Sequence, residues 1–394
     1  MTLRRTATAL VLLAIATCGA TAHTLNDSVS LEVVPLFDIE QSKPNFWKKV
    51  GGYLMGGGND STVNTSKTRF SIIGGPHYDS QAGLGLGVAG SAMFRLRGCD
   101  SLMQPSNVAL TGDVSLKGFW SVSLRSNILF PDDKMRINLD AVLAYSPTYY
   151  WGMGYDMAND NANKTLMKKL DIVVNANVLW RLTRGLYVGP MVQWDFTHTD
   201  ELDKPELLCG DDRTVRNYGV GLVVDYDTRD FITCASRGVY IHLAQLFRPS
   251  WLGNHYHYYT TNAKVAYYHK AWRDAIVAAE VMGVFNWGGY PSWAGMATMG
   301  DNYSMRGYYP GRFNDKHLLA AQLELRQHIW GPLGMVAWGG AGTVFHDSHS
   351  MGNILPNGGI GLRWAIRPRM NIRIDYGFGS KGNNGFIFTV NEAF

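Results

Sequence analysis

The stretch LDIVVNANVLWR, residues 170–181, shows the pattern that decides the fold. Its apolar residues recur at every second position and end at Trp180, and polar residues such as Asp171 stand between them. A period of two is the pattern of a β-strand with one apolar and one polar face. Residues 186–197 and 371–378 repeat it. The sequence therefore predicts amphipathic strands rather than helices.

Segments of this kind follow one another along most of the chain, and many exceed the five to six residues usual for strands of soluble proteins. Strands of about ten residues, with an apolar outer face, a polar inner face and aromatic residues near both ends, are typical of outer-membrane barrels. Closing the sheet satisfies every backbone group in lipid. We therefore predict an all-β fold, a 16-stranded antiparallel transmembrane β-barrel of the bacterial outer membrane, over residues 67–394. The expected strands are 67–75, 82–95, 106–116, 118–130, 133–146, 166–182, 185–198, 214–227, 236–247, 254–271, 272–287, 317–329, 332–346, 355–367, 369–379 and 385–394.

The composition of the 394 residues agrees with a membrane setting. Charged residues make up 17% of the chain, against about 25% in soluble domains. Helical multi-pass proteins need apolar runs of about 20 residues, which this chain lacks. The net charge of +4 is too small to suggest a nucleic-acid partner. Outer-membrane lipid is the expected partner.

The first residues read as an export signal. Arg4 and Arg5 precede an apolar run, and Ala20-Thr21-Ala22 is a small-x-small cleavage site, so residues 1–22 are an expected signal peptide. Residues 23–66 are an expected short periplasmic or luminal segment. They fit either a short amphipathic helix at the membrane surface or barrel mouth, or a Gly-rich tether.

The chain ends in another alternating segment. Phe386, Phe388, Val390 and Phe394 share one face of the expected last strand. A terminal amphipathic strand that ends in Phe resembles the sorting signal of bacterial outer-membrane proteins.

The long connection 288–316 contains MRGYYPGR at residues 305–312. The tetrad Met305, Arg306, Gly307 and Tyr308 resembles the sixth extracellular loop of the BamA/TamA superfamily, the bacterial surface antigen family. In that family the loop folds back into the lumen, and its arginine pairs with acids on the inner wall. The resemblance makes Glu324 the anchor of Arg306. Gly340 stands where the family often has a second acid, so Glu324 is expected to hold Arg306 alone.

Two further motifs resemble the same family in the same order. Asp227, Arg229 and Asp230, followed by Arg237 and Gly238, match its periplasmic D-x-R-D…RG turn. The glycine-rich segment 74–87 looks like the barrel start of members from the Bacteroidetes group. Members usually carry periplasmic POTRA domains of about 75 residues, and residues 23–66 are too few for one. The chain is thus identified as a member that lacks POTRA domains.

The resemblance implies a function in inserting or translocating proteins at the outer membrane, through a lateral seam between the first and last strands. Client outer-membrane proteins and a separate periplasmic partner in place of POTRA domains are then the expected partners. A passive or gated pore, or an accessory subunit of an outer-membrane complex, is the alternative.

An enzyme is the least favoured class. The chain contains no G-x-S-x-G, H-E-x-x-H or P-loop motif, and we expect no cofactor. His255 and His257 are spaced like a possible metal pair, but in a Tyr-rich segment they are more typical of a polar wall. We therefore expect no metal site.

Overall fold

The computed structural model describes residues 69–79, 83–99, 103–367 and 370–394. The expected signal peptide and the segment 23–66 lie outside the described residues. No helix in the described part of the chain is long and apolar enough to span a bilayer.

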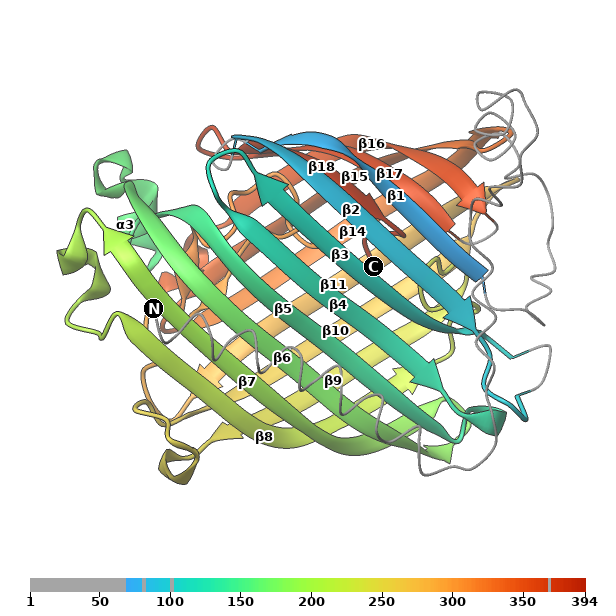
Figure 1. The fold of residues 1–394 in the computed structure, drawn as a ribbon, viewed down its shortest axis with the longest axis horizontal. Helices are drawn as coiled ribbons and strands as arrows, with labels where there is room; N and C mark the ends of the chain where they lie inside the picture. Colours follow the sequence, from blue (N-terminus) through green and yellow to red (C-terminus); the bar gives the residue numbers. More distant parts are fainter. Residues whose placement is uncertain (1–68, 80–82, 100–102, 368–369) are drawn as a thin grey trace, which may run out of the picture. The chain divides into compact units, whose positions relative to one another are not determined.

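A single antiparallel sheet of sixteen strands dominates the described residues, which confirms the predicted fold class. The strands follow the chain order from β1 to β18, and Figure 1 shows β3 to β8 passing in front of β9 to β11. The short strands β12 and β13 form a separate two-stranded sheet inside one connection. The strands are β1 (Arg69–Asp79), β2 (Gly83–Phe94), β3 (Ser106–Ser115), β4 (Trp120–Leu129), β5 (Met135–Tyr150), β6 (Thr165–Thr183), β7 (Leu186–Leu202), β8 (Thr214–Asp227), β9 (Gly238–Arg248), β10 (Tyr258–Lys270), β11 (Ala275–Trp287), β12 (Ala297–Thr298), β13 (Asn314–Asp315), β14 (His317–Trp330), β15 (Leu333–Phe345), β16 (Leu355–Arg367), β17 (Met370–Gly379) and β18 (Asn384–Val390).

Helical structure in the described residues is confined to short connections. These helices are η1 (Pro131–Asp133), α3 (Tyr155–Asn159), η2 (Asn161–Asn163), η3 (Pro205–Leu208), η4 (Ser250–Leu252) and η5 (Ser350–Gly352).

The predicted alternation matches the two faces of the sheet. Leu139 on β5 pairs with Ala176 on β6 on the outer, apolar face. One position earlier, Asn138 donates from Nδ2 to Oδ1 of Asn177 at 2.8 Å on the inner face. The period of two keeps this division along each strand, because a shift by one residue would turn every side chain to the other face.

Most strands differ from their expected bounds by one to four residues, and three of these differences bear on the predicted sites. β1 continues through Pro76 to Asp79, because an edge strand needs no ladder donor on its open side. β10 begins at Tyr258, so His255 and His257 lie in the preceding connection and are exposed, and the expected polar wall pair is wrong. β18 ends at Val390 rather than at the terminus, because Asn391 has a φ of 70°, which is incompatible with a strand.

The largest buried apolar cluster lies on the inner side of the sheet. Met299, Met305, Tyr308 and Phe313 from the connection 288–316 pack there against inward residues of the wall, among them Leu318. The connection therefore fills part of the interior, which we call the lumen.

Candidate functional site

The lumen-facing part of the connection 288–316 centres on Arg306, whose side chain is completely buried. Its Nη1 donates to Oδ2 of Asp375 on β17 at 2.8 Å, and its Nη2 pairs with Oε2 of Glu324 on β14. The Cζ atom of Arg306 also lies 3.8 Å from the ring centroid of Trp338 on β15. One cation thus joins the connection to three strands of the wall by charge-assisted hydrogen bonds and a stacking contact.

The expectation that Glu324 holds Arg306 alone is wrong, because Asp375 is a second acid. The space at Gly340 explains why no acid stands there: an added Cβ would lie 2.5 Å from the carbonyl oxygen of Ala321. Asp375 lies instead on the polar face of β17, two residues before Gly377. That position relative to a glycine was the only sequence signal that pointed to it.

The residues beside Arg306 fit the loop closely to β17. Gly307 has a φ of +104°, which residues with a side chain rarely adopt. A Cβ on Gly307 would lie 2.5 Å from the backbone carbon of Gly377, so the two backbones touch. Tyr308 accepts a hydrogen bond from the amide of Ser380 at 2.9 Å and donates to the carbonyl of Pro356 at 2.6 Å. Met305 is buried in the apolar cluster.

The two acids that hold Arg306 are shared with two further arginines of the wall. Arg326 donates from Nε to Oε1 of Glu324 at 2.6 Å, and Arg363 pairs through Nη1 with Oδ1 of Asp375. Arg363 also donates from Nε to Oε2 of Glu392 at 2.8 Å. The polar contacts that hold Arg306 therefore belong to one network that extends to Glu392 near the end of the chain.

The last four residues fold inward instead of extending β18. Arg326 donates from Nη2 to the carbonyl oxygen of Phe394 at 2.9 Å, and the Phe394 ring lies 6.2 Å from that of Tyr268 on the inner face of β10. Phe386 remains on the outer face and is 67% exposed. The expectation that Phe394 shares the outer face is wrong, because the turn at Asn391 reverses the direction of the chain. Phe388 and Val390 lie in β18, and their side chains are outside the described part of the structure.

Glu392 is buried beside these arginines. Burial alone would raise its pKa, but the guanidinium groups of Arg326 and Arg363 hold the pKa of this carboxyl below its ordinary value. The group is therefore an anion in the folded protein at neutral pH.

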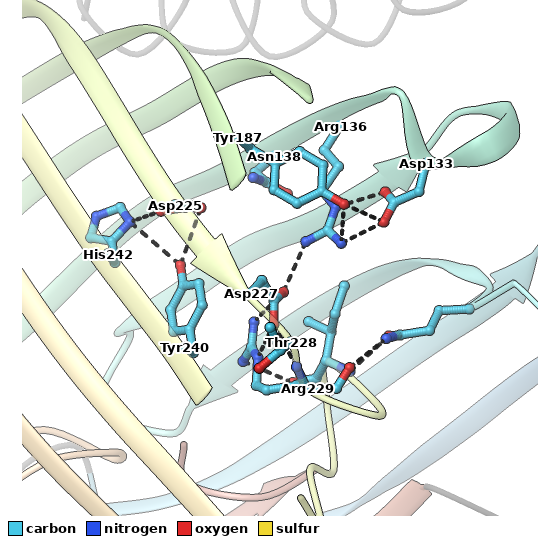
Figure 2. A network of polar contacts seen from close by, with 12 residues as sticks. Asp133, Arg136, Asn138, Tyr187, Asp225, Asp227, Thr228, Arg229, Tyr240 and His242 are labelled. Carbon is cyan, nitrogen blue, oxygen red and sulfur yellow. Dashed lines mark hydrogen bonds and ion pairs between the residues drawn. The ribbon is translucent and has the colours of Figure 1, made fainter. Parts of the chain in front are cut away.

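A second polar network surrounds the turn between β8 and β9 (Figure 2). Asp227 at the end of β8 accepts from Arg229 at 2.9 and 3.0 Å and from Arg136 on β5 at 2.8 Å. Burial alone would lower the pKa of Arg229, but the Asp227 carboxylate raises it above the ordinary value. These contacts fix the start of the turn to the wall at β5.

The rest of the turn motif closes the turn on itself. Asp230 accepts from the amide of Ser236 at 2.8 Å, and its own amide donates to the carbonyl of Arg237 at 3.1 Å. Gly238 has a φ of +113°, and a Cβ there would lie 2.4 Å from the carbonyl oxygen of Thr228. Only glycine fits this return into β9. The Arg237 side chain is exposed.

The described residues contain no group of three or more His, Cys, Asp or Glu that could hold a metal ion. His255 lies 3.5 Å from Asp212 at the surface.

The sequence that builds this geometry matches a known protein family. The model of the Omp85 superfamily domain matches residues 134–394, which is most of the sheet and includes both polar networks. The chain belongs to the Omp85 superfamily. Omp85 proteins are outer-membrane barrels that insert or translocate proteins, and they are not enzymes. The bacterial outer membrane is therefore the location of this protein.

Solved structures agree on the fold. BamA from Haemophilus ducreyi, in a crystal structure lacking POTRA domains 1–3, superposes with a TM-score of 0.51 at 11% identity, over 82% of this chain and 70% of that one. CdiB from Escherichia coli gives 0.51 at 12% identity, over 82% and 62%. CdiB from Acinetobacter baumannii gives 0.50 at 9% identity, over 82% and 59%. The chain thus matches about three fifths of the length of the CdiB chains.

No curated protein sequence matches the chain.

Proposed function

We propose that this protein assists the insertion or translocation of client proteins at the outer membrane through a lateral seam between β1 and β18, while the connection 288–316 stays folded in the lumen. The observation that carries the proposal is the order of the sheet. It ends at β1 on one side and at β18 on the other, and no ladder joins these two strands in the described residues.

The lengths of the two seam strands support a weak closure. β1 has eleven residues and β18 has seven, so part of β1 extends beyond any pairing with β18. Gly74, Gly75 and Pro76 in β1 reduce side-chain packing and remove one backbone donor. An unpaired strand edge is a template for a further strand, which is β-augmentation. A client strand is the proposed occupant of this edge.

The loop anchor gives the proposed seam a stable wall beside it. Arg306 binds β17, the strand that pairs with β18, and β14 three places further along the sheet. In this proposal the anchored loop holds β14 to β17 in place while the seam strands separate. In this proposal a separate periplasmic partner delivers the clients.

The proposal is tested by a chemical cross-link between the two seam strands, β1 and β18. The cysteines at 99, 209 and 234 are first replaced by serine. Ile72→Cys and Phe386→Cys then place one thiol on the outer face of each seam strand, where the native side chains are 59% and 67% exposed. A flexible bis-maleimide joins them in detergent before reconstitution into vesicles. The rate at which an unfolded outer-membrane client becomes protease-resistant is measured, with and without a periplasmic extract.

A matched control closes a pair of strands that does not separate in the proposal. Leu139→Cys and Ala176→Cys face each other on β5 and β6 on the same outer face. We expect the seam link to abolish the acceleration of client folding and the control link to preserve it. Equal activity of both linked proteins would reject the lateral seam.

A pore is the second candidate, and one observation favours it. The inner face carries half-exposed charges: the Arg125 and Asp140 side chains on β4 and β5 are 51% and 50% exposed, although Arg125 also donates to the Tyr303 hydroxyl of the lumen connection at 2.7 Å. A polar, exposed lumen wall is typical of water-filled barrels. Single-channel recording decides between the two, because a pore conducts without a client and a seam-operated barrel with a filled lumen conducts little.

A further inference from the structure

The turn of residues 228–237 begins in the middle of the sheet and contacts segments close to both of its ends. β8 and β9, which it connects, are the eighth and ninth of the sixteen strands in the sheet order. The nearest seam strand is therefore at least seven places away along the sheet. Residues of this turn nonetheless contact elements on both flanks of the seam. We call the segment 228–237 the strap.

The contact on the N-terminal flank is a reciprocal pair. Gln104, in the connection between β2 and β3, donates from Nε2 to the carbonyl of Arg229 at 3.1 Å. The amide of Ile232 donates to Oε1 of Gln104 at 3.0 Å. Both groups of one side-chain amide are thus bound to the strap backbone, although the two segments are more than a hundred residues apart in the chain.

The next three residues of the strap contact the C-terminal flank. The carbonyl of Thr233 accepts from the amide of Glu392 at 3.3 Å. Cys234 accepts through Sγ from Nδ2 of Asn371, at 3.6 Å, and Ala235 accepts through its carbonyl from Nη1 of Arg326 at 3.2 Å. Asn371 also donates to Oε1 of Glu392 at 2.8 Å, so the strap contacts the same inward-folded terminus that ends β18.

The base of the strap is rigid. Asp227 and Arg229 form two parallel hydrogen bonds, and Arg136 fixes Asp227 to β5 (Figure 2). A bidentate pair of this kind sets direction as well as energy. The strap therefore holds a fixed position from which its middle residues contact both flanks.

We propose that the strap is an autoinhibitory clasp, which holds the two flanks of the β1/β18 seam at a fixed separation and must release before the seam opens. This inference rests on the proposed lateral seam for its function, but the clasp itself is a physical coupling between the flanks. Its contacts are mostly single hydrogen bonds to backbone groups, each of modest net strength. A partner or client that competes for these backbone groups can therefore release the strap without unfolding the barrel.

The coupling makes a prediction that separate local contacts do not. If the strap joins the flanks, removing its contact with one flank raises the mobility of the strap and also of the other flank. Gln104→Ala removes the N-terminal contact, and Asn371→Ala removes the contacts with Cys234 and Glu392 without touching the anchor of Arg306. Gln327→Ala is the matched control, because Gln327 near the end of β14 is half-buried and its side-chain amide donates to the neighbouring His328 carbonyl.

Hydrogen exchange of the full chain in lipid nanodiscs, read by mass spectrometry, tests this coupling. We expect Gln104→Ala to speed the exchange of residues 228–237 and of residues 384–394 about fivefold, the factor that one lost hydrogen bond of ordinary strength gives in an opening equilibrium. Asn371→Ala should do the same for residues 228–237 and 103–105. The double variant should exceed either single one only slightly, and Gln327→Ala should leave all three segments unchanged.

A second readout uses the natural thiol of the strap. With Cys99 and Cys209 replaced by serine, the rate of maleimide labelling of Cys234 should rise in both variants. Gln104→Glu, which keeps the acceptor for Ile232 but loses the donor, should give a smaller rise. If Gln104→Ala does not insert into the membrane, Gln104→Glu takes its place in the test. A gel of unheated samples shows whether a variant has inserted.

The clasp is overturned if Gln104→Ala changes exchange only near residue 104, or if Cys234 labels at the wild-type rate in all variants. Neither measurement requires a client, so failure of the proposed function is distinguishable. Coupled flanks without client folding would reject the function and keep the clasp. Client folding with uncoupled flanks would reject the clasp and keep the function.

Discussion

The Asp375 carboxylate lies 2.8 Å from the Arg306 guanidinium, although the two residues are 69 positions apart in the chain. Both are completely buried, and the second oxygen of Asp375 binds Arg363. The carboxylate therefore neutralises a cation from the lumen loop and one from the wall. A cation buried without such partners would lose several kcal/mol of solvation.

The contacts of Arg306 predict that different variants of this anchor lose different amounts of stability. Arg306→Ala leaves Glu324 and Asp375 buried with one cation fewer, and removing one partner of a buried pair costs about 3–5 kcal/mol. Glu324→Gln should cost less, because Asp375 still binds Arg306. The double variant Arg306→Ala/Glu324→Gln should be less damaging than the sum of the two single changes, since the second change removes an acid that the first left without Arg306. The measurements are the heat-unfolding midpoint and the protection of the loop from external protease.

Arg312→Ala is the control for this series. Arg312 lies in the same loop and is also buried, but it donates to the carbonyl of Ala158 and to the side chain of Asn161 rather than to an acid. Arg312→Ala should lower the heat-unfolding midpoint and the protection of the loop less than Arg306→Ala does. Additive effects in the Arg306/Glu324 cycle, or a protease-sensitive loop in the wild type, would contradict the anchor.

The sheet predicts heat-modifiable migration. Sixteen strands paired in sequence order bury their backbone hydrogen bonds together, so detergent alone should not unfold them. An unheated sample should migrate faster on a gel than a boiled one, and its circular dichroism should show β-structure. A helical spectrum would be incompatible with this fold.

The chain terminus predicts two separable effects of Phe394. Deleting Phe394 removes both its ring contact with Tyr268 and its carbonyl contact with Arg326, and it removes the expected sorting residue. We expect a lower level in the outer membrane and more degradation in the periplasm. Tyr268→Leu removes only the packing partner.

Comparison of these two variants assigns the cause. If Phe394 acts mainly in sorting, Tyr268→Leu should reach the membrane at the wild-type level and lose only heat resistance. Equal membrane levels of both variants and the wild type would count against a sorting role.

Glu392 predicts a loss of stability in acid. Its pKa is lowered in the folded protein, so it contributes its full stabilisation above the ordinary Glu pKa of about 4.3 and loses it as the pH falls through the lower folded value. The advantage of the wild type over Glu392→Gln in the heat-unfolding midpoint should be largest at pH 7 and should shrink below pH 4.3. An advantage that is constant from pH 7 to pH 3 would mean that the carboxylate is not held by Arg326 and Arg363.

The sequence by itself determined the local features of this protein. The alternation of apolar and polar residues determined the strand type and the two faces within each strand, because a strand repeats every two residues whatever lies around it. Glycine positions such as Gly238 marked a turn for the same reason, since backbone conformation is a local property.

Only the tertiary structure decided which distant residues meet. Asp375 was visible as a polar residue of its strand, but its pairing with Arg306 depends on how the curved sheet brings β14 and β17 around one loop. The inward turn of Phe394 and the contacts of Gln104 with Ile232 likewise depend on which strand ends face each other across the lumen. Sequence periodicity carries no information on these distances, because the stagger of the strands and the closure of the sheet set them together.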